Sequence, residues 1–310
     1  MKKMESKHRD QSKSIYFLML LVPLFWGGAF VTAKHVITEI PPLVAGTLRF
    51  GITGIILAII VLIQKEWHWK EIKKHWKGLL FIGFIGVFGY NALFFTALKY
   101  TSATNGALII AAMPVFTMVG SVLFCKGNWN NKFGIGLSLS LMGVIIVIVK
   151  GSLSALSSLS FNLGDLLFVA ALLCGVIYAL TGKSIIQGVP VMLSNTIMML
   201  SGAIFLAIST VFEGGWDKVS NMSAQSWIEM AYMVVCGTLI GYVIFNKGVE
   251  LLGGSKASMY LNLTPIVATL LAVIAYGSSI TLTQIVGMVM VLIGVYVATS
   301  KTSGRKSSVN

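Results

Sequence analysis

The stretch that decides the fold is residues 97–150, ALKYTSATNGALIIAAMPVFTMVGSVLFCKGNWNNKFGIGLSLSLMGVIIVIVK. It predicts a short turn, an apolar helix with Pro114 in its middle, a polar loop and a second apolar helix. The same layout returns at residues 248–301, where adding 151 to each position aligns the two stretches without a gap and places Pro114 on Pro265. The chain therefore contains two copies of one helical unit.

The repeat extends towards the N-terminus. The same shift puts Gly86 on Gly237, and a shift of 148 carries Pro42 to Pro190. The proline matches carry the most weight, because the chain has only 6 prolines and apolar matches between membrane helices mean little. We interpret the whole chain as two copies of one membrane module.

The composition identifies the class of protein. The chain is 56% hydrophobic and 11% charged, whereas a soluble domain carries roughly 25% charged residues. A net charge of +13 would suggest nucleic-acid binding in a soluble protein. Here the cations lie in loops and tails, where they set membrane topology. We therefore predict the lipid bilayer as a partner and no nucleic acid.

Ten apolar segments have about the length that crosses a bilayer core of ~30 Å. The first could instead be a signal peptide, but its apolar part is long for one and no clear cleavage site follows. The predicted spans are 15–34, 42–63, 78–98, 104–125, 133–150, 163–182, 190–212, 227–248, 255–276 and 281–299.

These spans divide the chain into two repeats of five helices, flanked by tails. The basic loop at 64–77 is expected to lie on the membrane surface as a short amphipathic helix. The predicted parts are a tail at 1–14, repeat 1 at 15–150, a linker at 151–162, repeat 2 at 163–299 and a tail at 300–310.

Charge orients the chain. Lysines and arginines are concentrated in residues 1–14, 64–77 and 300–310, and few lie in the segments that alternate with these. The positive-inside rule then places both termini in the cytoplasm, in a protein of the plasma or inner membrane. Because five is odd, the second repeat is inverted relative to the first. Such repeats are typical of transporters that expose a midplane site to each side in turn.

Short motifs along both repeats carry a family resemblance. They are FWGGAF at 25–30 ending in Lys34, Pro41 with Pro42, Arg49 with Phe50, ALKYTSA at 97–103 running to Pro114, GDLL at 164–167 and NLTP at 262–265. This pattern resembles the EamA family of the drug/metabolite transporter superfamily. The resemblance implies ten helices, an inverted five-plus-five repeat, and transport of metabolites, often amino acids and often outward. Repeat 2 differs from repeat 1 at one position of the motif, where Cys174 is equivalent to Trp26 by the 148-residue shift.

Several polar residues lie within predicted spans. Because a polar side chain facing lipid is costly, they are expected to face the interior. Two interpretations stay open, hydrogen bonds between helices or a polar cavity that binds a small-molecule substrate. The candidates are Tyr90, Asn91, Tyr178, Tyr242, Asn246, Ser258 and Asn262.

Arg49 and Trp26 are the other two candidate substrate-binding residues. Arg49 is the one charge well inside a predicted span, where it either snorkels to the interface or binds a carboxylate or phosphate. Trp26 lies near the bilayer centre, where its indole N–H needs a partner. It either packs on a polar group of the next helix or lines the cavity and contacts substrate.

Pro114 and Pro265 are the candidate hinges. Each proline removes one backbone hydrogen bond and clashes with the preceding turn. An ordinary kink is one interpretation. The symmetric placement of the two prolines favours a hinge or a cavity boundary.

No motif for covalent chemistry stands out. The 3 cysteines show no metal-binding spacing, and the 4 histidines lie in loops or the tail, so no catalytic residue, metal or cofactor is predicted. We predict no enzyme but a secondary transporter of small metabolites, amino acids or related compounds among them, that exports by alternating access around a midplane cavity. The alternatives are a membrane-embedded enzyme or a channel. The sequence does not determine the oligomeric state.

Overall fold

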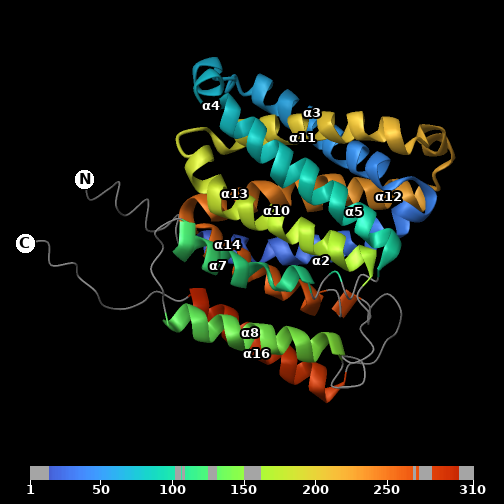
Figure 1. The fold of residues 1–310 in the computed structure, drawn as a ribbon. Helices are drawn as coiled ribbons and strands as arrows, with labels where there is room; N and C mark the ends of the chain where they lie inside the picture. Colours follow the sequence, from blue (N-terminus) through green and yellow to red (C-terminus); the bar gives the residue numbers. More distant parts are fainter. Residues whose placement is uncertain are drawn as a thin grey trace, which may run out of the picture.

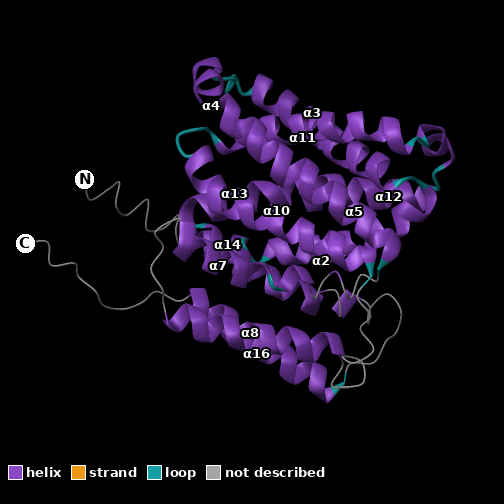
Figure 2. Cartoon of the chain, viewed as in Figure 1, coloured by secondary structure: helices purple, strands orange, loops and turns teal. Residues whose placement is uncertain are grey.

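A computed structural model describes residues 14–101, 106, 109–124, 131–149, 162–267, 270–271 and 281–299. In this part of the chain the regular elements are helices joined by short loops (Figure 2). In repeat 1 they are α2 (Leu21–Glu39), α3 (Pro42–Ile63), α4 (Trp69–Ile82), the π-helix η1 (Gly83–Gly89), α5 (Tyr90–Tyr100), α7 (Met113–Phe124) and α8 (Asn131–Val149). In repeat 2 they are α10 (Leu163–Ile186), α11 (Val191–Glu213), the 3-10 helix η2 (Trp216–Asn221), α12 (Ala224–Tyr232), the π-helix η3 (Met233–Ile240), α13 (Gly241–Leu252), α14 (Gly254–Met259), the 3-10 helix η4 (Tyr260–Leu263) and α16 (Leu282–Thr299).

Within the described residues, six helical stretches are long and apolar enough to cross a membrane. Elements that follow one another without a break form single stretches, as α4, η1 and α5 do. The six are Ser14–Glu39, Pro42–Ile63, Trp69–Tyr100, Leu163–Gly182, Val191–Glu213 and Ala224–Leu252, and three shorter apolar helices cover Ile109–Phe124, Asn131–Ile146 and Ile285–Ala298.

The basic segment 64–77 does not form a separate helix, and its place relative to the membrane surface stays a prediction. The helix that crosses the bundle already begins at Trp69. Residues 69–77 contain neither glycine nor proline, and Glu71 lies 3.8 Å from His75 one turn later. Since nothing interrupts the helix before Gly78, the amphipathic part continues directly into the apolar part.

Equivalent helices of the two repeats pack against each other. α3 lies beside α11 at one side of the bundle, and α8 lies beside α16 at the opposite side (Figure 1). Between them, α2 packs on η3 and α12, and its counterpart α10 packs on the equivalent elements η1 and α4. The match is not complete, because α10 also packs extensively on α5, whereas α2 packs much less on the equivalent α13.

The α8–α16 contact shows this symmetry at single residues. A methyl group on Gly136 would collide with the carbonyl oxygen of Gly294, and one on Gly143 would collide with that of Gly287. Gly136 and Gly287 are equivalent by the 151-residue shift, as are Gly143 and Gly294. The contact is therefore reciprocal, as across a two-fold axis, and the glycines let the two backbones approach closely.

Both repeats also carry a π-helix at the same place. Adding 151 to η1 carries Gly83 to Val234 and Gly89 to Ile240, the end of η3. A π-helix holds more residues per turn than an α-helix and is frequent at functional sites. The glycines of η1 lie against the neighbouring helices, where a methyl group on Gly86 would overlap the ring of Tyr178. The residues that follow each π-helix are consequently turned to a different face.

The two prolines stand at helix interruptions. α7 begins at Met113, so Pro114 is its second residue and follows a turn at Ala112. In repeat 2, the 3-10 helix η4 ends at Leu263, just before Pro265. The turn at Ala112 interrupts the apolar helical stretch Ile109–Phe124 just before Pro114, as expected where a proline ring clashes with the preceding helical turn. The hinge role of both prolines stays a prediction, and parts of spans 104–125 and 255–276 lie outside the described residues.

Candidate functional site

A cavity lies in the bundle at the meeting of the two repeats. Its space for the centres of water-sized molecules is about 60 Å³, whereas one water needs roughly 10–15 Å³ on this measure. The cavity therefore has room for several waters or a small solute. Its lining residues are Trp26, Ala29, Phe30, Arg49, Gly86, Tyr90, Asn91, Phe94, Met113, Gly175, Tyr178, Tyr242, Phe245 and Leu261.

Equivalent residues of the two repeats face each other across this cavity. Asn91 and Tyr242, which are 151 residues apart, are in direct contact, with Asn91 Nδ2 donating to Tyr242 Oη at 3.4 Å. Phe94 and Phe245 are a second equivalent pair in the lining. Because a residue can meet its own counterpart only at the symmetry axis, the pseudo-two-fold axis passes through the cavity.

Trp26 forms part of the wall and is held by a hydrogen bond. Its Nε1 donates to the carbonyl oxygen of Gly237 at 2.7 Å. The indole ring lies 5.2 Å from the ring of Tyr242 and 5.1 Å from that of Phe245, measured between centroids. The indole N–H therefore has the partner on a neighbouring helix that it needs, and the same side chain borders the cavity. Contact with substrate stays a prediction.

Arg49 reaches the cavity from α3. Its Nε donates to Thr238 Oγ1 at 2.7 Å, and Thr238 Oγ1 in turn donates to the carbonyl oxygen of Met233 within η3. The residue is only 5% exposed. The guanidinium thus points into the protein and not towards the membrane surface, which is the geometry that anion binding requires.

Three predicted residues, Asn246, Ser258 and Asn262, are not among the residues that line this cavity. Tyr178 Oη donates to Asn246 Oδ1, and Asn246 Nδ2 donates to Asn195 Oδ1. Ser258 Oγ donates to the carbonyl oxygen of Ser255 at 3.1 Å, and Asn262 Nδ2 donates to Ser140 Oγ at 2.9 Å. For Asn246 and Asn262 the contacts are hydrogen bonds between helices, the first of the two interpretations that the sequence left open.

Sequence reasoning missed most of the apolar lining. Phe30 lies one turn after Trp26, Phe94 lies one turn after Tyr90, and Phe245 follows Tyr242 by three residues. This i, i+3 or i, i+4 spacing from a predicted residue is the signal that could have found the three rings. The other residues not predicted are Ala29, Gly86, Met113, Gly175 and Leu261.

The chemistry of the lining suits binding. It offers one cation, three tyrosine hydroxyls, one carboxamide and several aromatic faces. Among the residues that the structure describes, no cluster of histidine, cysteine or carboxylate side chains could hold a metal ion. Such a surface can recognise a small molecule through charge, hydrogen bonds and ring contacts.

Comparison with known proteins identifies the family. The sequence model of the EamA-like transporter family matches residues 13–149 and 162–300, once in each repeat. The chain belongs to this EamA-like transporter family. It is 31% identical over 285 residues to the "Uncharacterized transporter YyaM" of Bacillus subtilis, covering 92% of this chain and 93% of that protein. It is also 25% identical over 292 residues to the "Probable amino-acid metabolite efflux pump" of Salmonella typhimurium, covering 91% and 93%.

A solved crystal structure shares the fold of this EamA-family protein. The TM-score is 0.76 at 17% identity, over 92% of this chain and 96% of the other. Family membership, transporter relatives and the apolar helices together identify a multi-pass membrane transporter.

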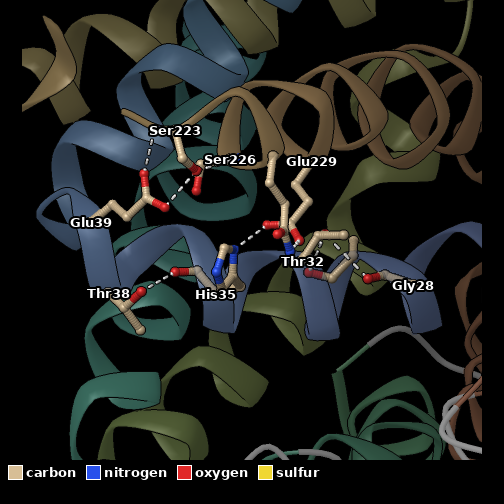
Figure 3. A network of polar contacts seen from close by, with 10 residues as sticks. Gly28, Thr32, His35, Thr38, Glu39, Ser223, Ser226 and Glu229 are labelled. Atoms are coloured by element: carbon tan, nitrogen blue, oxygen red, sulfur yellow. Dashed lines mark hydrogen bonds and ion pairs between the residues drawn. The ribbon is translucent and has the colours of Figure 1, made fainter. Parts of the chain in front are cut away.

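A polar network joins the two EamA repeats at the C-terminal end of α2 (Figure 3). His35 Nδ1 lies 2.7 Å from Glu229 Oε2 on α12. The backbone N–H and hydroxyl of Ser223, the N-cap of α12, donate to the carboxylate of Glu39 at 2.8 and 2.7 Å. Any motion that separates α2 from α12 at this end must break these contacts.

Proposed function

We propose that this protein is a secondary transporter that exports small metabolites, amino acids or related compounds among them, by alternating access around the cavity. The observation that carries the proposal is the position of the cavity on the pseudo-two-fold axis, where Asn91 meets its counterpart Tyr242. When two related halves rock about such an axis, a central site is exposed to each side in turn.

The α8–α16 contact supports inversion of the repeats. Gly136 meets Gly294 and the later Gly143 meets the earlier Gly287, so the two helices run antiparallel. Because they are counterparts, the units to which they belong have opposite orientations. We extend this to ten membrane-spanning helices with both termini in the cytoplasm, as the distribution of basic residues favours. One relative's name, an amino-acid metabolite efflux pump, supports the outward direction.

Counterflow in liposomes tests the transport mechanism. Purified protein is reconstituted into vesicles preloaded with an unlabelled mixture of amino acids and the carboxylates related to them, and entry of each radiolabelled compound is followed. We expect transient, saturable accumulation of at least one of them, which Trp26→Ala abolishes or extends to further compounds and Phe212→Ala leaves unchanged, because Phe212 is 91% exposed at the end of α11. Flux that never saturates would indicate a channel, and covalent conversion of the solute would indicate an enzyme.

The direction of transport is tested in intact cells. Metabolites in the medium of cells with and without the protein are compared, with the Trp26→Ala variant as control. Export predicts that a carried metabolite accumulates outside only when the unaltered protein is present. Depletion of that metabolite from the medium would contradict the outward direction.

A further inference from the structure

Arg49 carries a charge that the protein itself does not neutralise. Its Nε donates a hydrogen bond to the hydroxyl of Thr238, which is neutral. In the described part of the chain, the ion pairs involve His35, His75 and Lys247, and none involves Arg49. Its other contacts are with neutral groups: the guanidinium carbon lies 5.0 Å from the centre of the Phe50 ring, and Nη2 lies close to Gly237. The terminal nitrogens Nη1 and Nη2 supply four of the five donors of the side chain, and Arg49 lines the cavity.

The described acidic residues lie away from the cavity lining. The chain has 10 in all, and two of them lie within residues 1–13, outside the described part. Among the others, Glu229 pairs with His35, and Asp165 accepts from the hydroxyl of Thr101 at 2.6 Å. Glu39 accepts from Ser223 and Glu213 from the backbone N–H of Leu43. None of the eight described acids lines the cavity.

A buried cation without a partner is unfavourable, and arginine cannot lose its proton to escape the cost. A ligand that brings one negative charge removes this penalty, and the planar guanidinium fits a carboxylate through two parallel hydrogen bonds. Arg49 is the one cation among the described residues that line the cavity. It can neutralise one negative charge of a ligand, and a second negative charge would stay unpaired.

The remaining lining defines the rest of the ligand. Trp26, Phe30, Phe94 and Phe245 provide ring faces, and the Tyr242 ring lies between Trp26 and Phe50. An aromatic or apolar body packs well on such rings. None of the described residues that line the cavity carries a carboxylate to pair with an ammonium group, and an ammonium next to the substrate carboxylate would be held close to the Arg49 cation.

We propose that Arg49 binds the carboxylate of a monoanionic substrate with an aromatic or apolar body, and that the cavity selects it over the zwitterionic amino acid of the same skeleton. This inference rests on the proposed transport function and narrows its substrates to amino-acid-related carboxylates that lack a positive amine.

Three probes with one aromatic body test the selectivity. They are 3-phenylpropionate, which carries only the carboxylate, phenylalanine, which carries both charges, and phenethylamine, which carries only the amine. Binding to the purified full-length protein in detergent is measured by titration calorimetry. We expect 3-phenylpropionate to bind at least tenfold more tightly than phenylalanine, and phenethylamine not to bind at millimolar concentration.

Variants of Arg49 assign the effect to the guanidinium. Arg49→Gln should weaken 3-phenylpropionate binding at least 30-fold, and Arg49→Lys should weaken it less, because Lys keeps the charge but loses the bidentate geometry. The exposed Lys218→Gln, which removes the same charge far from the cavity, should change nothing. Thr238→Val removes the hydrogen bond to Nε and keeps the charge, so it should weaken binding severalfold and serves if Arg49→Gln does not fold.

Several outcomes would overturn the proposal. Phenylalanine could bind as tightly as 3-phenylpropionate, none of the three probes could bind, or folded Arg49→Gln or Thr238→Val could bind 3-phenylpropionate normally. Saturable counterflow of zwitterionic amino acids, together with any of these results, would refute the inference and leave the proposed transport function standing.

Discussion

Trp26 donates a hydrogen bond to Gly237, and its ring forms part of the cavity wall. Two substitutions can distinguish the effects of these two features. Trp26→Phe removes the N–H and with it one hydrogen bond to a backbone carbonyl, at a cost of about 0.5–1.5 kcal/mol. Trp26→Ala also removes the ring, at about 3–5 kcal/mol. We expect Phe to lower the melting temperature and alter the apparent affinity, and Ala to abolish transport or broaden the substrate range. Normal affinity and selectivity in both folded variants would refute a role in substrate contact.

Asn246 is expected to stabilise the protein without contacting substrate, unlike Trp26. It accepts from Tyr178, which lines the cavity, and donates to Asn195, but it does not itself border the cavity. Asn246→Ala leaves both partners without their hydrogen bond, which costs about 1–3 kcal/mol. We therefore expect a lower melting temperature and a change in apparent affinity no larger than that of Tyr178→Phe, which removes the same hydrogen bond from the lining. A larger change in affinity than in Tyr178→Phe would show that Asn246 itself contacts substrate.

At the scale of an element, the π-helix η1 depends on close approach to α10. A methyl group on Gly86 would overlap the Tyr178 ring, whereas one on Gly51 in α3 would meet only Ala203 Cβ at 4.0 Å. Gly86→Ala overpacks this contact, which typically costs about 1–3 kcal/mol, and displaces a ring that lines the cavity. We expect reduced stability and transport in Gly86→Ala and neither effect in the matched Gly51→Ala. Equal behaviour of the two variants would contradict the packing role of η1.

For the whole molecule, the inverted arrangement makes a prediction about sidedness. Reporter fusions at Asn310 and within residues 151–162 should report the cytoplasm and the opposite side respectively, because five spanning helices separate each from the other. Their position can be measured with paired enzyme reporters that are active on one side of the membrane only. Both reporters on one side would exclude five spans in repeat 2, and the reverse pattern would contradict a cytoplasmic C-terminus.

The sequence by itself determined the class of protein, the internal repeat and most of the helices. A bilayer-length apolar window and a proline at a helix start are local properties, so the predicted span 42–63 coincides with α3. Polar residues inside apolar spans are local signals too, and they led to Trp26, Arg49, Tyr90, Asn91, Tyr178 and Tyr242 in the cavity lining.

Only the tertiary structure decided which residues of a helix face reach the cavity. Tyr242 and Asn246 lie one turn apart on the same face of α13, but only Tyr242 borders the cavity, and Asn246 is bonded to Tyr178 and Asn195. In the same way, the sequence neighbours of Arg49 do not reveal whether an acid from another helix reaches it. The pairing of helices depends on contacts between residues far apart in the chain, and the hydropathy of a single segment contains no information about those contacts.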